Sequence, residues 1–71
     1  MENSLTEREQ NVLVYLTQGL TNEKIAKRMN ISIHTVKAHI ETIYEKLGVA
    51  NRVQAAIKAV VTGLVDLNTL L

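Results

Sequence analysis

The sequence predicts an all-α fold, a four-helix bundle with a central helix-turn-helix, in a single domain over residues 1–71. Three observations favour this fold. Apolar residues recur at helical spacing in four separate segments of the chain. A residue that commonly caps helix starts precedes each segment, and glycine or asparagine follows each one, as is common where helices end. A length of 71 residues also limits the chain to one domain.

The first helix is expected over about residues 7–18. Thr6 and Glu9 are spaced as a capping box, in which each side chain accepts a hydrogen bond from the backbone N–H of the other residue. Gly19 ends the helix, because glycine takes up the left-handed conformation without a steric penalty. The buried stripe of this helix consists of Val12, Leu13 and Leu16.

A short second helix, over about residues 22–29, follows Thr21 as its N-terminal cap. Its apolar side consists of Ile25, Ala26 and Met29. Only residues 30–32 separate this helix from the next, and two helices joined by about three residues cross steeply. We therefore predict a helix-turn-helix, in which the small side chain of Ala26 permits close approach of the two helices.

The third and longest helix is expected over about residues 33–47, between Ser32 as its cap and Gly48. Its apolar face consists of Val36, Ile40, Ile43 and Leu47. The opposite face carries His34, Lys37, Ala38 and Glu41. Such a helix packs on the core through one side and offers short and charged side chains to a partner. A solvated amphipathic helix without a partner has the same pattern.

The fourth helix, over about residues 52–62 after Asn51, is apolar on two stripes, of which only one can face the bundle. The first stripe consists of Ala55, Ala56, Ala59 and Val60, and the second of Val53, Ile57 and Val61. The small alanines suit tight packing, so we expect the second stripe to be exposed and to form the interface of a homodimer. The alternative is that this stripe packs under the C-terminal tail, on Leu64, Leu67 or Leu70.

The net charge of +1 hides a segregation along the chain. Residues 24–58 hold seven basic and two acidic side chains, a net charge of +5, whereas residues 1–23 carry −3 and residues 59–71 carry −1. A basic middle with acidic ends can present a positive face to an anionic partner. Chance segregation on a mixed surface is the competing interpretation.

Several functional classes have little support. The sequence holds no nucleophile signature and no glycine-rich phosphate loop, and its two histidines are spaced so that they do not share a helix face. We therefore expect no catalytic residues, no cofactor and no metal. No apolar run approaches the roughly 18 residues of a membrane span, and no signal-peptide core follows Met1. We expect a cytoplasmic protein that does not contact a membrane.

Binding to double-stranded DNA is favoured by three features that agree. An α-helix fits the major groove, where base edges differ between base pairs. The third helix keeps small Ala38 on its outer face, where the backbone can approach the bases, and Lys24 and Lys37 supply cations nearby. A helix N-terminus also favours phosphate. The rival interpretation is a helical module whose basic face binds an acidic protein, which would not need the steep helix pair.

The predicted DNA contacts form two groups. Lys37 and Glu41 should read base edges or contact adjacent phosphates, whereas the start of the second helix should hold the phosphate backbone. The groove-facing group is Ser32, His34, Thr35, Lys37, Ala38 and Glu41, and the backbone group is Thr21, Asn22 and Lys24.

Five segments in order resemble the LuxR/FixJ-type (GerE-like, NarL-like) DNA-binding domain: LTERE at 5–9, GLTNEKIA at 19–26, IS at 31–32, TVKAH at 35–39 and KLGVANR at 46–52. The resemblance covers residues 4–64. It implies a bacterial transcription regulator, either the output domain of a response regulator or a small stand-alone regulator. The exposed second stripe of the fourth helix leads us to expect a homodimer on a pseudo-palindromic promoter site, and RNA polymerase is a further candidate partner.

The chain departs from this family pattern at two places. Response-regulator members often carry a second basic residue four positions after the lysine of the Thr-Val-Lys motif, where this chain has Glu41. Glu41 can accept a hydrogen bond from cytosine N4, or it can repel phosphate and narrow the range of sites. The usual order Asn-Lys-Glu appears here as Asn22-Glu23-Lys24, which moves the cation by one position.

The promoter-recognising domain of sigma factors is also similar, but the segment at 46–52 and the fourth helix favour the LuxR/FixJ type.

Overall fold

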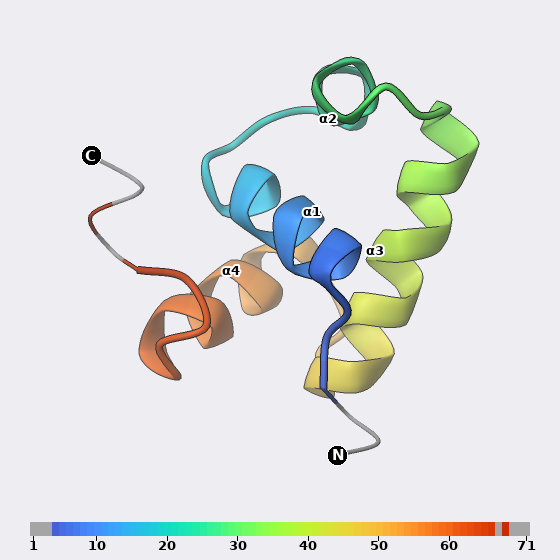
Figure 1. The fold of residues 1–71 in the computed structure, drawn as a ribbon. Helices are drawn as coiled ribbons and strands as arrows, with labels where there is room; N and C mark the ends of the chain where they lie inside the picture. The colour runs from blue at the N-terminus through green and yellow to red at the C-terminus, as the bar shows by residue number, and fades with distance from the viewer. Residues whose placement is uncertain (1–3, 67, 69–71) are drawn as a thin grey trace.

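The computed structural model describes residues 4–66 and residue 68. Within them the chain forms four α-helices, α1 (Glu7–Thr17), α2 (Asn22–Met29), α3 (Ile33–Leu47) and α4 (Arg52–Val61), and no strand. Helix α1 lies at the centre, α3 runs along one side of it, α2 lies across the start of α3, and α4 lies on the other side (Figure 1). The predicted all-α class is confirmed, and each observed helix lies within one residue of its expected bounds.

Each helix begins at the predicted cap. The Thr6 hydroxyl accepts a hydrogen bond from the Glu9 N–H at 3.1 Å, and the Glu9 carboxylate accepts one from the Thr6 N–H at 2.9 Å, so the capping box is complete. Thr21, Ser32 and Asn51 cap α2, α3 and α4 in the same way, each accepting a backbone N–H three residues later. Because these bonds satisfy donors that would otherwise lack partners, the sequence alone determines where the helices start.

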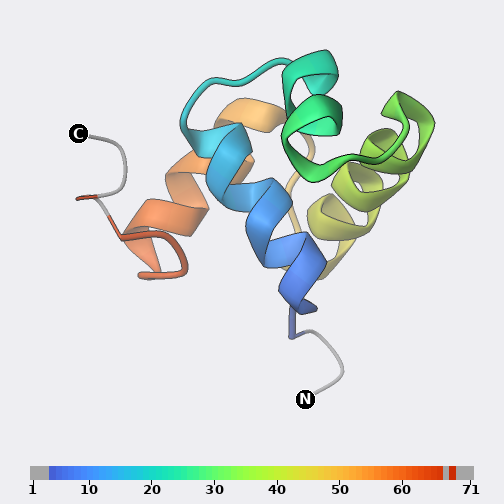
Figure 2. The ribbon, with the colours of Figure 1, turned by 45° about the horizontal axis from the view of Figure 1, so that its top comes forward.

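The end of α2 explains the tight connection to α3. Asn30 takes the left-handed conformation with φ of 56°, and the Ile31 N–H donates to the carbonyl of Ala26 at 3.0 Å. A left-handed residue after a helix, followed by a hydrogen bond back to the last turn, changes the direction of the chain within two residues. Helix α3 therefore starts only four residues after the last residue of α2, and the two helices cross near their joined ends (Figure 2).

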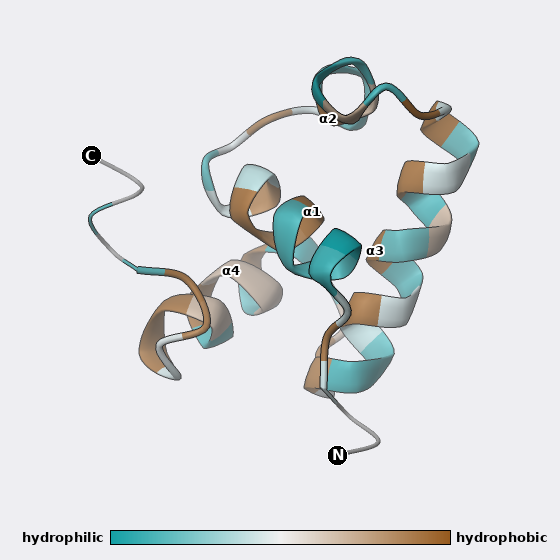
Figure 3. Ribbon diagram, viewed as in Figure 1, coloured by the Kyte–Doolittle hydropathy of each residue, from teal (hydrophilic) through white to brown (hydrophobic). Residues whose placement is uncertain are grey.

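The core lies between α1, α3 and α4, with α2 closing one end. The apolar faces of α1 and α3 turn toward each other, and the outer side of α3 is hydrophilic (Figure 3). The buried apolar residues of the core are Val12, Leu13, Leu16, Ile25, Ala26, Val36, Ile40, Ile43, Leu47, Ala55, Ala59 and Val65. The first eleven belong to the predicted helical stripes. Val65 was not predicted: its N–H donates to the Ala59 carbonyl at 3.0 Å, which folds the chain after α4 back onto the bundle.

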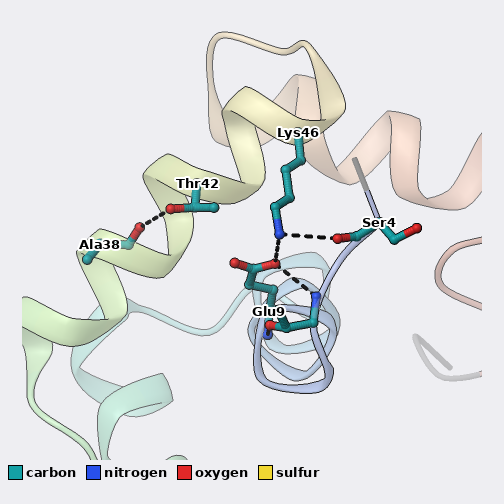
Figure 4. Close-up of polar contacts among 6 residues, drawn as sticks. Ser4, Glu9, Ala38, Thr42 and Lys46 are labelled. Carbon is teal, nitrogen blue, oxygen red and sulfur yellow. Dashed lines mark hydrogen bonds and ion pairs between the residues drawn. The ribbon is translucent and has the colours of Figure 1, made fainter. Parts of the chain in front are cut away.

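One buried ion pair joins the first helix to the third. Glu9 is only 6% exposed, and its carboxylate accepts a hydrogen bond from Lys46 Nζ at 2.7 Å (Figure 4). The same ammonium donates to the Ser4 carbonyl at 3.1 Å. Burial raises the pKa of Glu9, but the hydrogen bonds from Lys46 and from the Thr6 backbone outweigh it, so the pKa lies below the ordinary glutamate value. The Glu9 carboxylate is therefore held ionised between α1 and α3.

Candidate nucleic-acid interface

The outward face of α3 is as predicted. Its buried side consists of Val36, Ile40, Ile43 and Leu47, while His34, Lys37, Ala38 and Glu41 are all exposed. Lys37 and Glu41 form no hydrogen bond or ion pair with other described residues, so both charges face solvent. The Thr42 hydroxyl donates to the Ala38 backbone carbonyl at 3.1 Å (Figure 4), and the short Ala38 side chain is exposed. A face with one small residue between free charges can approach a groove closely.

An open cleft of about 620 Å³ lies between the start of α2 and the first turns of α3. Its lining residues are Gly19, Leu20, Thr21, Asn22, Glu23, Ile33, Lys37 and Arg52. The structure thus brings together Thr21 and Asn22 from the predicted backbone-binding group and Lys37 from the groove-facing group. Lys24 is exposed on α2 but does not line this cleft.

Two of the predicted DNA-contacting hydroxyls, those of Thr21 and Ser32, also cap helices. Thr21 accepts a hydrogen bond from the Lys24 N–H at 3.2 Å, and Ser32 accepts one from the Thr35 N–H at 3.0 Å. The hydroxyls of Ser32 and Thr35 lie 2.9 Å apart and share a hydrogen bond. A hydroxyl that accepts a hydrogen bond can still donate its proton, so capping leaves Thr21 able to donate to a further acceptor.

Five residues of the cleft are not among the predicted DNA contacts: Gly19, Leu20, Glu23, Ile33 and Arg52. Ile33 is 41% exposed and sits on α3 between its buried and outward faces. Arg52 comes from the start of α4 and donates to the Leu20 carbonyl at 3.0 Å and to Asn22 Oδ1. The signal for Ile33 was its spacing of four residues from Lys37. No local pattern indicates the position of Arg52, which is 30 residues from Asn22 in the chain.

The positive face is narrower than the charge of the middle segment suggests. Lys46 is paired with Glu9, Arg52 is bonded to the α1–α2 connection, and Lys58 Nζ donates to the Leu47 carbonyl at 2.7 Å. The exposed cations that remain in this segment are Lys24, Lys27 and Lys37, together with Arg28, which lies over the Tyr15 ring of α1, 5.9 Å from its centroid. They lie on α2 and on the first turns of α3, so the positive charge is concentrated at the helix-turn-helix.

The second stripe of α4 is exposed, as predicted. Val53, Ile57 and Val61 are 67%, 59% and 78% exposed. Of the predicted inward stripe, Ala55 and Ala59 are fully buried, and Ala56 and Val60 are half-buried. Of the tail residues that could have covered the stripe, Leu64 is itself exposed, and Leu67 and Leu70 lie outside the described residues. The orientation of α4 is thus confirmed, and its use as a dimer interface stays a prediction.

No group of three or more histidine, aspartate or glutamate side chains is placed to hold a metal ion in residues 4–66 and 68. In the same part of the chain no helix has the length and apolar character needed to cross a bilayer.

Comparison with known proteins gives consistent matches. Residues 3–59 match the family described as bacterial regulatory proteins, luxR family. The chain is 55% identical over 53 residues to the nitrate/nitrite response regulator protein NarP of Escherichia coli (strain K12), covering 75% of this chain and 25% of NarP. It is 46% identical over 56 residues to the transcriptional regulatory protein LiaR of Bacillus subtilis (strain 168), covering 79% of this chain and 26% of LiaR.

A third relative is the response regulator protein VraR of Staphylococcus aureus (strain NCTC 8325 / PS 47), 46% identical over 55 residues, covering 78% of this chain and 26% of VraR. The chain therefore spans about a quarter of the length of these relatives. The matched family covers most of the chain, and the capped, steeply crossing pair of α2 and α3 is the helix-turn-helix that the motifs predicted. The chain belongs to the luxR family of bacterial regulatory proteins, as a helix-turn-helix domain.

Proposed function

We propose that this domain binds double-stranded DNA sequence-specifically and thereby regulates transcription, with α3 as the recognition helix in the major groove. The observation that carries the proposal is the outward face of α3, where Lys37, Ala38 and Glu41 are exposed while the opposite side of the helix is buried. Free charges beside a small residue suit contacts to base edges. The concentration of exposed cations on α2 and the start of α3 supports a polyanionic partner.

The start of α2 supplies the backbone contacts in this proposal. Thr21 and Asn22 line the same cleft as Lys37, and Lys24 is exposed one turn further along α2. The N–H groups at a helix start attract phosphate, and the Thr21 hydroxyl adds a donor there. A phosphate held at this point fixes the angle at which α3 enters the groove, because α2 and α3 are joined by only three residues.

In this proposal, side chains in the middle of α3 contact the base edges. Lys37 can donate to guanine O6 and N7, Ala38 can contact a thymine methyl group, and Glu41 can accept from cytosine N4. His34, Ser32 and Thr35 lie at the N-terminal end of the same helix and contact the flanking bases or sugars. Because a carboxylate repels phosphate, Glu41 also disfavours placements of α3 in the groove that bring its side chain close to the DNA backbone.

A homodimer on DNA is part of the proposal. Val53, Ile57 and Val61 form an exposed apolar row at intervals of four residues, and Ile57 and Val61 also line a shallow apolar depression of about 340 Å³ with Ala56 and Val60. Two copies joined through this row would be related by a two-fold axis and would place two α3 helices on successive half-sites of a pseudo-palindrome. A helix of ten residues buries little area, so the dimer is weak without DNA.

The regulatory context follows the family and its relatives. We propose that the chain acts in the cytoplasm, as the output domain of a response regulator or as a small regulator of its own. A dimer bound at a promoter lies where RNA polymerase assembles, so polymerase is the further partner of this proposal. NarP and VraR are both named response regulator proteins, and LiaR is named a transcriptional regulatory protein. The names of NarP and VraR support the first alternative.

Selection of bound sequences from a random duplex library tests the proposal directly. We expect a short motif to be enriched, and to recur as an inverted repeat with half-sites about 10 base pairs apart or a multiple of this. Lys37→Ala and Glu41→Ala should each change the enriched base at one position. Recovery of random sequences by the wild-type chain would contradict sequence-specific binding, because phosphate contacts alone would then account for the affinity. Recovery of no duplex at all would favour an acidic protein as the partner of the basic face.

A further inference from the structure

Arg52 connects the fourth helix to the start of the second. It is the first residue of α4, and its guanidinium donates through Nη1 to the Leu20 carbonyl at 3.0 Å and through Nη2 to Asn22 Oδ1. These two acceptors flank Thr21, the cap of α2. Figure 2 shows the first turn of α4 beside the connection from α1 to α2. A single side chain thus holds both sides of the α2 start.

The guanidinium is suited to this task because its donors are fixed in one plane. Two acceptors bonded to it cannot shift independently of each other. The other backbone hydrogen bonds of the α1–α2 connection are local: the Gly19 N–H donates to the Leu16 carbonyl at 3.0 Å, and the Leu20 N–H donates to the Tyr15 carbonyl at 3.1 Å. Arg52 ties this connection to a helix more than 30 residues away in the chain, and so fixes where α2 begins relative to the rest of the bundle.

The bond to Asn22 also orients a side chain. With Oδ1 accepting from Arg52, the two N–H donors of the Asn22 amide form no hydrogen bond with other described residues. Asn22 lines the cleft that Lys37 also lines, so these donors can serve an acceptor there, such as a phosphate oxygen. Without Arg52 the amide is free to rotate, and its oxygen would repel the same phosphate.

We propose that Arg52 is a positioning residue for DNA binding: it presents the Asn22 amide and the start of α2 to a backbone phosphate without contacting that phosphate itself. This inference rests on the proposed function. It gives α4 an indirect part in DNA binding in addition to the proposed dimerisation, since Arg52 directly precedes Val53, the first residue of the exposed apolar row.

The chain offers a matched control on the same helix. Lys58 Nζ donates to the Leu47 carbonyl at 2.7 Å, so it too is an α4 cation that bonds the end of a neighbouring segment. Lys58 does not line the cleft. Lys58→Met should therefore alter stability, as Arg52→Gln does, but should leave the affinity of the folded protein for DNA unchanged.

The test is a double-mutant cycle in DNA affinity. Arg52→Gln, Asn22→Ala and the double variant are titrated against one bound duplex by fluorescence anisotropy at several salt concentrations, with the folded fraction measured by circular dichroism. We expect Arg52→Gln and Asn22→Ala each to weaken binding roughly tenfold, and the double variant to bind no worse than either alone. Arg52→Lys, which keeps the charge and can reach one acceptor, should recover part of the loss. If Arg52→Gln does not fold, Arg52→Lys replaces it in the cycle.

The outcomes separate the alternatives. A slope of log K against log salt that falls in magnitude by about 0.9 in Arg52→Gln would show that Arg52 contacts phosphate itself, which overturns the positioning role. Additive losses in the double variant, or an unchanged affinity in Arg52→Gln, would overturn it as well. If the wild-type chain binds no duplex, the proposed function fails. If it binds and Arg52→Gln binds equally well, the positioning inference alone fails.

Discussion

Replacing Lys46 by methionine removes the cation that neutralises Glu9 inside the bundle. Glu9 is 6% exposed and Lys46 Nζ lies 2.7 Å from its carboxylate, so methionine would leave a buried carboxylate facing an aliphatic chain. Breaking a buried ion pair by removing one partner costs about 3–5 kcal/mol. Domains have roughly 0.05–0.15 kcal/mol of stability per residue, which for 71 residues is about 4–11 kcal/mol. Because the Lys46 side chain is 21% exposed and the pair is only partly buried, the loss should lie near the lower end of that range. The variant should therefore lose a large part of its stability and still be mostly folded at ordinary temperature.

The dependence on pH separates the ion pair from simple loss of packing. Because the pKa of Glu9 is lowered in the folded state, the pair contributes stability above the unfolded glutamate pKa, and this contribution is lost as pH falls through the folded-state pKa. The stability difference between wild type and Lys46→Met should shrink below about pH 4, since a protonated Glu9 needs no cation. Glu9→Gln should be less stable than wild type at pH 7. Its free energy of unfolding should also fall less steeply as the pH is lowered, because the variant has no carboxylate to protonate at this position.

Urea unfolding followed by circular dichroism at several pH values measures these differences. Lys37→Met is the matched control, because it removes an exposed lysine from the same helix and should change stability by less than about 0.5 kcal/mol. A Lys46→Met variant within that same margin of wild type at pH 7, or a difference that does not depend on pH, would refute the argument that a buried charge pair joins α1 to α3.

Further predictions concern the interface. If Lys37 bonds guanine, Lys37→Ala should weaken DNA binding by roughly 1–3 kcal/mol and relax the base preference at one base pair. Affinities for duplexes substituted at each position measure both effects. Equal binding to every duplex by variant and wild type would remove Lys37 from the interface. Glu41→Lys should raise affinity for random duplex in a mobility-shift titration, because it replaces a charge that repels phosphate by one that attracts it, and a lower affinity would contradict the placement of this face. Ile57→Glu should leave the monomer folded, since Ile57 is 59% exposed, but should abolish concentration-dependent dimers in sedimentation and weaken binding to a two-half-site duplex far more than to a half-site. Unfolding of this variant, or equal losses on both duplexes, would argue against the dimer.

The elements that could be predicted are those specified by local chemistry. Thr6, Thr21, Ser32 and Asn51 accept hydrogen bonds from N–H groups only three residues away, so each helix start can be recognised from a short stretch of sequence. The orientation of α4 was predictable for a similar reason. Small alanines on one stripe and larger valines on the other leave a single compact arrangement.

The contacts that escaped prediction join residues far apart in the chain. Lys46 and Arg52 looked like members of a basic surface, yet one is bonded to Glu9, 37 residues away, and the other to Leu20, 32 residues away. Periodicity indicates which face of a helix is buried, but not which distant polar group a long side chain reaches. Val65 escaped for a different reason, because its burial depends on how the chain turns after Gly63 and not on helical periodicity.

The most direct test of the account is to titrate the isotope-labelled domain with its selected duplex and follow the backbone amides by NMR. If α3 enters the major groove with the start of α2 on the backbone, the largest shifts should fall at Asn22, Glu23, Lys37, Ala38 and Glu41. Random duplex should perturb mainly the start of α2, because phosphate contacts do not depend on sequence. Shifts concentrated instead on the outer side of α1, with α3 unchanged, would contradict the claim that α3 reads DNA.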